Sequence, residues 1–353
     1  YTLQYQKAEP GDVIGKATWS VELFTIGCGY LVEPVERDIL EGENTAQALL
    51  RLLHDSGYIA FYGGSFTCLP RSRQLYYLQA AAPAIAAGRI GGIRISTKPD
   101  AVDAATCSFL QEAGVTTVEL GVQSFNSKVL SAAGRGYQTQ TAEKACLTVR
   151  EAGLRLGVQL MTGLPEDTPR LAREAVIRSA ELGAELLRIY PTLVLADTAL
   201  AAWYQQGDYM PQSLAEAVSC CRDMAIAARA KGLTIIRMGI NPSADVESAL
   251  VAGPYHPAFG GLVLEAVKKA QIIDLLADYD TAKAATLYFP PVDLPLIWGH
   301  KRASLQQLTA AYPLLTLQSD TLLPRGSLRW VCGEESRLSQ ETYWCQKTVS
   351  AWQ

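Results

Sequence analysis

The sequence contains no run of eighteen consecutive apolar residues, which excludes a membrane-spanning helix of ordinary length. Its first residues, Tyr1-Thr2-Leu3-Gln4, have neither the basic start nor the apolar stretch of a secretory signal. Charged residues make up only 19%, and the net charge of −4 excludes a global basic field for nucleic acid or an anionic membrane. An initiating Met is also missing, as is typical of a processed, trimmed or incomplete chain.

Cysteine is present but is not arranged as a disulfide framework. The eight cysteines are scattered along the chain, at positions 28, 68, 107, 146, 220, 221, 332 and 345. Several of them fall inside helical apolar patterns, which indicates reduced thiols and a cytoplasmic protein. With 353 residues, of which 49% are apolar, the chain is long enough for a substantial core and about two domains.

Short apolar strands alternate with longer amphipathic helices over the middle of the chain. The expected strands are 58–62, 92–96, 116–121, 156–161, 185–190 and 233–238. The expected helices between them are 71–84, 101–113, 142–152, 168–182 and 214–230. Glycine follows the end of four of these helices, at Gly114, Gly153, Gly183 and Gly232. Strands about thirty residues apart with a helix between them predict βαβ units and a parallel sheet.

The number of strands predicts an incomplete barrel. Six are too few for eight βα units and fit either a partial (β/α)6 TIM-like barrel or an open doubly wound sheet. An earlier strand could lie in 19–26, followed by a helical pattern at 45–54. We expect a divergent segment in 1–57, the barrel in 58–260, and a small α+β C-terminal subdomain in 261–353, with helices at 262–277 and 304–311.

Polar residues follow the ends of the expected strands, where parallel α/β folds place their chemistry. They include amides, hydroxyls, Lys98, Arg188 and Arg237, which would suit a polar, partly anionic small molecule. The Gly63-Gly64 pair after the first strand would let the backbone approach a ligand, but tight packing alone explains such a pair equally well.

Four segments together resemble the radical S-adenosylmethionine (SAM) superfamily, in its Elp3-like and coproporphyrinogen-dehydrogenase-like branch. They are IAFYGGSFT (59–67), IRISTKPD (93–100), VELGVQSF (118–125) and GLPEDT (163–168), in the order and spacing of that family. The resemblance runs from about residue 57 to about residue 260. Residues 288–312 also look like the C-terminal part of bacterial Elp3-like radical proteins whose substrate is unassigned.

The resemblance implies a SAM site on the first two strand ends. The family's glycine pair, which holds the amino group of the methionine moiety, corresponds to Gly63 and Gly64, with Ser65 alongside. The position that contacts the nucleoside is often acidic in the family and is Ser96 here. This departure in residue type makes the nucleoside contact less certain than the contact with the carboxylate.

The resemblance also assigns residues further along the barrel. Gln123 is the Gln of the G-V-Q segment, and Arg135 corresponds to the residue expected to meet the cofactor's carboxylate, for which an Arg fork is well suited. Gln159 stands at a position that is often Asp. In a purely structural alternative, the two Gln side chains bind strand-end backbone groups and Arg135 pairs with a surface carboxylate such as Glu119 or Glu166.

The cysteine motif of the superfamily is not found. Its members bind a [4Fe–4S] cluster through a C-x3-C-x2-C run ahead of the glycine pair, and the only upstream cysteine here is Cys28, with Val32 and Val35 at the other two positions. Three explanations are open: an altered N-terminal segment, which we favour; a degenerate paralogue; or an unusual site formed by Cys28 with Cys68 or Cys107. No metal ligand and no catalytic residue is therefore assigned, and Cys28 is only a weak candidate.

The resemblance implies an enzyme that cleaves SAM reductively and abstracts hydrogen from a substrate that is not identified. Elp3-like relatives act on tRNA, but the net negative charge of this chain gives no general support for tRNA binding. The chain ends soon after its small C-terminal region, so we expect no acetyltransferase domain. A catalytically silent SAM-binding barrel is the alternative, and a phosphate-binding barrel unrelated to the superfamily is a third possibility.

Two basic features of the C-terminal half have both a functional and a plain interpretation. Lys301-Arg302 beside His300 could touch a phosphate, although adjacent cations are more often simply exposed. His256, in a proline-rich turn, could line a pocket, although a capped histidine is the commoner case.

Overall fold

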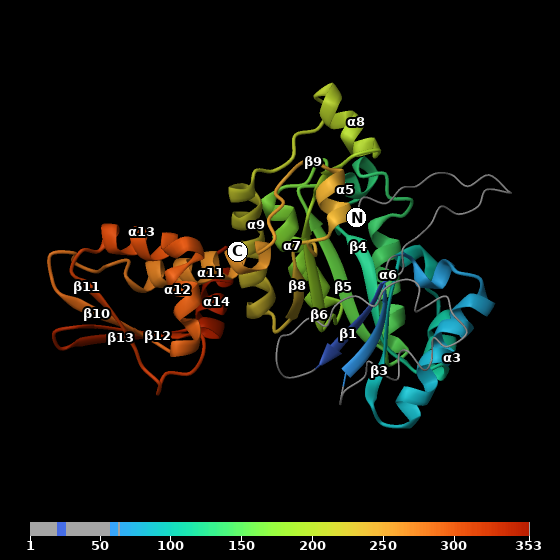
Figure 1. Cartoon of the computed structure of the whole chain (residues 1–353), viewed down its shortest axis with the longest axis horizontal. Helices are drawn as coiled ribbons and strands as arrows, with labels where there is room; N and C mark the ends of the chain where they lie inside the picture. Colours follow the sequence, from blue (N-terminus) through green and yellow to red (C-terminus); the bar gives the residue numbers. More distant parts are fainter. Residues whose placement is uncertain (1–19, 26–56, 63, 353) are drawn as a thin grey trace. The chain divides into compact units, whose positions relative to one another are not determined.

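The computed structural model describes residues 20–25, 57–62 and 64–352 (Figure 1). They form two compact units, each of which we treat by itself. The N-terminal unit runs up to Leu160 and includes Arg178–Arg188, whereas the C-terminal unit contains Met161–Ile177 and the chain from Ile189 onward. No helix in these described ranges is long and apolar enough to cross a membrane.

A seven-stranded sheet with the order β1-β2-β3-β4-β5-β6-β8 dominates the first two thirds of the chain. Its strands are β1 (Ser20–Thr25), β2 (Gly57–Tyr62), β3 (Ile90–Thr97), β4 (Val115–Gln123), β5 (Arg155–Thr162), β6 (Leu186–Pro191) and β8 (Thr234–Met238). Six of them run parallel and curl into a half-barrel, which confirms the predicted partial TIM-like barrel. Each strand from β2 onward lies within a few residues of its predicted range.

The first strand differs from the barrel strands in direction. β1 pairs antiparallel with β2, with Ser20 opposite Tyr62 and Thr25 opposite Gly57. The strand expected at 19–26 is therefore present but is not a further parallel barrel strand. The helix expected at 45–54 lies outside the described residues.

Helices connect the strands as the sequence predicts. They are α3 (Arg71–Ala86), α4 (Ala104–Glu112), α5 (Ser127–Ala132), α6 (Thr139–Glu151), α7 (Pro169–Glu181), α8 (Ala199–Gln206) and α9 (Leu214–Ala230), with short 3-10 turns η1 (Phe66–Cys68) and η2 (Pro99–Ala101). Local side-chain hydrogen bonds define where some of these helices begin: Ser213 and Glu216 form a capping box at the N-terminus of α9. The four glycines predicted to end helices all have positive φ, between +74° and +88°, where glycine carries no steric cost.

The C-terminal part of the chain forms a second sheet covered by helices. This sheet has the order β11-β10-β12-β13, from β10 (Ala285–Phe289), β11 (Leu315–Ser319), β12 (Ser327–Cys332) and β13 (Glu335–Gln340). The helices and turns here are α11 (Phe259–Leu275), η3 (Pro291–Asp293), α12 (Leu294–Trp298), η4 (His300–Arg302), α13 (Ala303–Ala311) and α14 (Glu341–Ser350). Earlier in the chain, β7 (Val194–Leu195) and β9 (Leu250–Ala252) pair antiparallel in a separate small sheet, and α10 (Ala244–Ala249) precedes β9. One core cluster joins Leu275 of α11 with Leu287 and Trp330 of the sheet, so the expected α+β subdomain is confirmed.

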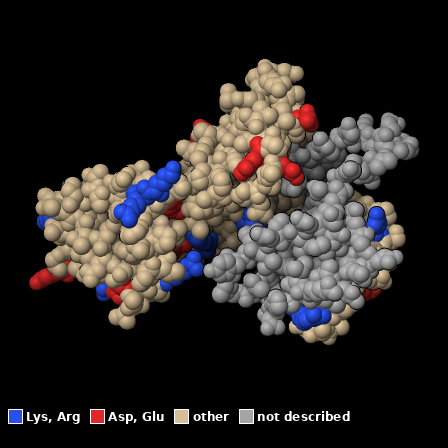
Figure 2. Space-filling model, viewed as in Figure 1, with Lys and Arg blue, Asp and Glu red and all other residues tan. Residues whose placement is uncertain are grey.

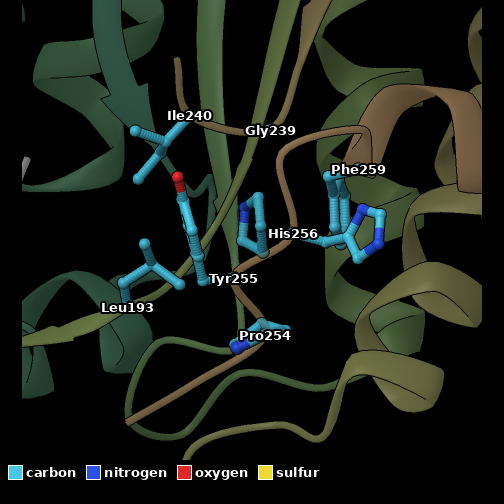
Figure 3. Close-up of a pocket in the computed structure, with 8 residues that line it drawn as sticks. Leu193, Gly239, Ile240, Pro254, Tyr255, His256 and Phe259 are labelled. Carbon is cyan, nitrogen blue, oxygen red and sulfur yellow. The ribbon is translucent and has the colours of Figure 1, made fainter. Parts of the chain in front are cut away.

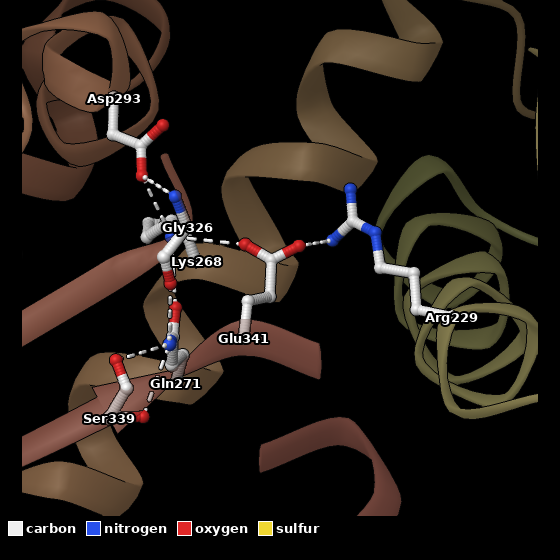
Figure 4. A network of polar contacts seen from close by, with 7 residues as sticks. All are labelled: Arg229, Lys268, Gln271, Asp293, Gly326, Ser339 and Glu341. Atoms are coloured by element: carbon white, nitrogen blue, oxygen red, sulfur yellow. Dashed lines mark hydrogen bonds and ion pairs between the residues drawn. The ribbon is translucent and has the colours of Figure 1, made fainter. Parts of the chain in front are cut away.

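A buried ion network connects α11 with other elements of the C-terminal unit (Figure 4). Lys268 is 1% exposed, and its Nζ lies 3.1 Å from both Asp293 Oδ2 and Glu341 Oε2. Arg229 of α9 forms an ion pair with the other oxygen of Glu341. Two cations thus face two carboxylates, and a balanced set of this kind is tolerated in an interior where a single charge would not be.

Candidate functional site

One face of the half-barrel sheet carries the polar side chains of the N-terminal unit. Ser96, Glu119 and Gly157 are aligned in register across β3, β4 and β5. Side chains two residues apart on a strand share a face, so Arg94 lies on the same face as Ser96. On β4, a register shift between Leu120 and Gln123 interrupts this alternation. The strands therefore bring residues from three separate sequence segments to one surface.

A buried carboxylate, Glu119, lies at the centre of this face. Arg94 and Arg188 each form an ion pair with it, and the Tyr62 hydroxyl donates a 2.7 Å hydrogen bond to its Oε1. Burial by itself raises the pKa of Glu119, but the attraction of Arg188 and Arg94 outweighs this and holds the pKa below its usual value. With the Tyr62 pKa raised by burial and by Glu119, the group consists of two cations, one anion and a neutral phenol.

This group corrects one sequence-based alternative. Glu119 is 2% exposed and forms ion pairs with Arg94 and Arg188, so it is neither a surface carboxylate nor the partner of Arg135. The sequence analysis missed Tyr62 and Arg94 altogether. Arg94 could have been found as a charged residue in the middle of an apolar strand, Ile93-Arg94-Ile95, because this pattern indicates a buried and paired charge.

Arg135, Gln123 and Gln159 come together around the end of β4. Gln159 Nε2 donates a 3.3 Å hydrogen bond to Gln123 Oε1. Arg135 donates from Nη2 to the Gly121 carbonyl at 3.1 Å and from Nε to the Tyr137 hydroxyl at 3.3 Å. These bonds fix the guanidinium along one edge, and its third nitrogen, Nη1, has no hydrogen-bond partner within the described ranges.

Gly121 provides the open space between these side chains. A β carbon added there would lie 3.0 Å from Gln123 Nε2 and 3.9 Å from Arg135 Nη2. Gln123 itself has a φ of +67°, a left-handed conformation that costs a non-glycine residue about 1–2 kcal/mol. Such strain is retained where a side chain must be held in one orientation, as at a ligand contact.

The loop after β2 is hydrogen-bonded to the end of β3. The hydroxyls of Thr67 and Thr97 lie 2.5 Å apart, and the Ser65 carbonyl accepts the N–H of Cys68 at 3.0 Å. Gly64 and Ser65 are thereby placed at the strand end that follows Ser96. Gly63, the other half of the predicted glycine pair, lies outside the described residues.

The cysteines do not fit the expected cluster. Cys28 lies outside the described residues, and Val32 and Val35 cannot ligate iron. Of the other two proposed partners, Cys68 is exposed and Cys107 is buried, and burial raises the pKa of both thiols. The described residues contain no group of three or more His, Cys, Asp or Glu that could hold a metal ion.

The loops after β5, β6 and β8 belong to the C-terminal unit, which is described here by itself. In the GLPEDT segment, Asp167 accepts a 2.9 Å hydrogen bond from the Gly163 N–H, and burial raises its pKa to about 6. Figure 3 shows a small pocket in which Tyr255 and His256 lie near Gly239, the residue after β8. The Nδ1 atom of His256 accepts the N–H of Ala258 at 3.0 Å, as expected for a capped histidine in a turn.

Two family models match the chain. The model of the Radical SAM superfamily covers residues 29–176, and that of the Radical_SAM C-terminal domain covers residues 184–269. Residues 270–353 lie beyond both matches.

Individual relatives match over shorter stretches. A tRNA uridine(34) acetyltransferase from Dehalococcoides mccartyi is 32% identical over 127 residues, which is 35% of this chain and 28% of that protein. Elongator complex protein 3 of Drosophila melanogaster is 26% identical over 192 residues, 48% of this chain and 35% of that protein. The chain thus spans about a third of the length of either relative.

A solved structure confirms the fold. The archaeal Elp3 of Methanocaldococcus infernus, with its N-terminus deleted, superposes with a TM-score of 0.55 at 21% identity, over 64% of this chain and 57% of that one.

Proposed function

The chain belongs to the radical SAM superfamily through residues 29–176 and 184–269, and we propose that it is a SAM-binding enzyme of the Elp3-like type. The family membership excludes the third possibility raised by the sequence, a phosphate-binding barrel unrelated to the superfamily. The division into 1–57, 58–260 and 261–353 and a cytoplasmic location are part of the same proposal. The described cysteines are all free, which supports a reducing compartment.

The arrangement of Arg135, Gln123 and Gln159 around Gly121 carries the proposal. The guanidinium would hold the carboxylate of the methionine moiety, because two of its nitrogens are fixed by protein oxygens and the third is left for a ligand. Gln123 and Gln159 would hold the ribose hydroxyls, for which an amide can both donate and accept.

The remaining contacts of the proposed cofactor site lie at the ends of β2 and β3. The backbone at Gly63, Gly64 and Ser65 would hold the amino group, and Ser96 would contact the nucleoside. The Glu119 group lies on the same face and fixes the strands that carry these residues, because its ion pairs join β3, β4 and β6.

In the superfamily, a [4Fe–4S] cluster reduces the sulfonium of SAM and the resulting radical abstracts hydrogen from the substrate. The cysteines of this chain do not supply the three thiolates at the family's spacing, so the proposal rests on the cofactor site alone. The name of the Dehalococcoides mccartyi relative, tRNA uridine(34) acetyltransferase, supports a tRNA-related substrate, which we include in the proposal.

The test is SAM affinity measured by isothermal titration calorimetry on the full chain. We expect Arg135→Ala to weaken binding by about tenfold or more, and Arg135→Lys to fall between it and the parent because the fork is lost but the charge remains. Arg155→Ala is the matched control, since Arg155 is half-exposed and its ion pair is with Glu185, at 2.9 Å. Unchanged affinity in Arg135→Ala would refute the cofactor site.

The missing cysteine motif favours a second candidate, a barrel that binds SAM without cleaving it. Iron and acid-labile sulfide after anaerobic reconstitution, followed by 5′-deoxyadenosine formation with a strong reductant, separate the two functions. About four irons per chain together with 5′-deoxyadenosine would establish the enzyme. SAM binding without iron would establish the silent barrel.

A further inference from the structure

The segment from Leu294 to Ser319 contains no Asp or Glu, although the chain as a whole is acidic. Its three basic residues, His300, Lys301 and Arg302, are consecutive and exposed, and they follow Gly299. We call residues 299–302 the basic turn. It lies beyond both family models, in a part of the C-terminal unit that the proposed SAM site does not use.

The backbone of the basic turn is held in an unfavourable conformation. Lys301 and Arg302 have φ values of +51° and +60°, which cost each non-glycine residue about 1–2 kcal/mol. Glu265 of α11 accepts the N–H of His300, and a β carbon at Gly299 would lie 1.8 Å from the same carboxylate. Glycine or asparagine would suit these positions better, so the local conformation alone does not account for the cations at 301 and 302.

In this region Glu265 contacts the backbone of the turn, whereas the cationic side chains have no ion-pair partner in the part of the chain that the structure describes. Within the described ranges, no carboxylate forms an ion pair with Lys269, Lys301 or Arg302, and Lys269 instead contacts the amide of Gln307. Figure 2 shows one continuous blue stripe of Lys and Arg atoms near the place where Figure 1 labels α11 and α13. The result is a local positive field on an otherwise acidic protein.

An aromatic ring lies within the same surface. Trp298 is 37% exposed, and the Arg302 guanidinium lies 4.9 Å from its ring centroid. Cations beside an exposed aromatic ring are the combination that binds single-stranded nucleic acid, since phosphates meet the charges and a base stacks on the ring. An acidic peptide would use the charges but leave the ring without a partner.

The basic turn is connected to the end of the barrel within the C-terminal unit. The His300 ring packs edge-on against the His256 ring, with 5.6 Å between centroids. His256 in turn lines the pocket of Figure 3 together with Pro191, the last residue of β6, and Gly239, which follows β8. A strand bound at the turn would therefore reach the carboxyl ends of two barrel strands, where parallel folds act on their substrates.

We propose that the basic turn, with Trp298 and Lys269, binds a single-stranded segment of RNA and guides it toward these strand ends. Lys269, Lys301 and Arg302 contact phosphates, and one base stacks on Trp298. The inference rests on the proposed function for its substrate class. RNA binding and SAM binding are nevertheless separate measurements, so either can fail without the other.

The test uses the full chain and a fluorescein-labelled twelve-nucleotide RNA, followed by fluorescence anisotropy over a range of salt concentrations. Lys301→Gln/Arg302→Gln is expected to weaken binding by about tenfold and to lower the slope of log K against log salt by about 1.4, or 0.7 for each lost phosphate contact. Arg325→Gln/Lys347→Gln removes the same charge from two other exposed positions of this unit and is the matched control. Circular dichroism melts show whether each variant is folded.

Trp298→Ala separates base stacking from charge. It is expected to weaken RNA binding by about five- to tenfold with the salt slope unchanged, whereas Tyr343→Ala, at a site that is 70% exposed, has no effect. Equal losses in the charge variant and its control, or a Trp298→Ala variant that binds as well as the parent, would overturn the proposal. Two further results would overturn it by showing a general anion or lipid surface. One is displacement of the RNA by polyglutamate, and the other is binding to anionic vesicles that is weakened by the same substitutions as RNA binding.

Discussion

Gly157 of β5 lies directly against the side chain of Glu119 on β4: a β carbon at 157 would come within 2.8 Å of Glu119 Cγ. Glu119 cannot move aside, because two arginines and a tyrosine hold its carboxylate. We expect Gly157→Ala to lower the free energy of unfolding by about 1–3 kcal/mol, measured by urea denaturation. Gly136→Ala, where a β carbon meets nothing within 4 Å, is the control and should change it by less than about 0.5 kcal/mol.

Removing the charge of Glu119 should be more costly. Glu119→Gln leaves Arg94 and Arg188 buried without a carboxylate, and we expect a loss of about 3–5 kcal/mol in urea denaturation. Tyr62→Phe removes the hydroxyl that donates to Glu119 and accepts from Arg188 but leaves both ion pairs of Glu119 in place, and it should cost about 1–2 kcal/mol. If Glu119→Gln cost less than Tyr62→Phe, the ion pairs would not be what holds these strands.

Glu119 also predicts a pH dependence. Its pKa is lowered in the folded chain, so the stability it contributes is present above the ordinary carboxyl pKa and is lost as the pH falls through the folded pKa. Asp167 has the opposite sign, because burial raises its pKa from 3.8 to about 6. Its contribution therefore becomes less favourable as the pH rises from about 4 to about 6.

For Asp167 the test is the unfolding free energy of Asp167→Asn between pH 4 and pH 7. The amide oxygen can still accept the N–H of Gly163 but carries no charge. Relative to the parent, the variant should gain about 1–3 kcal/mol over this range. A constant difference between variant and parent would contradict the raised pKa.

The buried network around Lys268 should be essential for the C-terminal unit. Lys268→Met leaves Asp293 and Glu341 without the shared cation, and we expect a loss of about 3–5 kcal/mol. Lys283→Met is the control, since Lys283 is exposed and its Nζ lies 3.9 Å from Asp280, a pair worth less than about 1 kcal/mol. Similar losses in both variants, measured by urea denaturation, would argue against the network.

Local features of the fold could be predicted because they depend on neighbouring residues. The helix at 214–230 was predicted at the bounds it has from its apolar pattern and from Gly232 after its end, and in the structure Ser213 caps its first turn. The strands were recognisable as continuous apolar runs, as expected when both faces of a sheet are covered. The direction of β1 was not predictable, because an isolated strand carries no information about its partner.

The centre of the candidate site depended instead on distant pairings. Glu119 is separated from Arg94 by 25 residues and from Arg188 by 69, and only the register of the sheet brings them together. Nothing in the residue pattern favoured these partners over a surface charge. Arg135, Gln123 and Gln159 were found through a family resemblance, and their mutual contacts became visible only in the fold.

The order of the strands in the half-barrel sheet has a consequence for how the chain folds and for where its sequence can diverge. From β1 to β6, each strand pairs with the strand that precedes it in the chain, so the sheet can grow at one edge as residues leave the ribosome. Because β1 contributes a single pairing at the outer edge, substitutions or rearrangements there leave the pairings among β2 to β6 and β8 intact. The architecture thus permits the segment around β1 to diverge in evolution while the parallel strands of the half-barrel stay assembled.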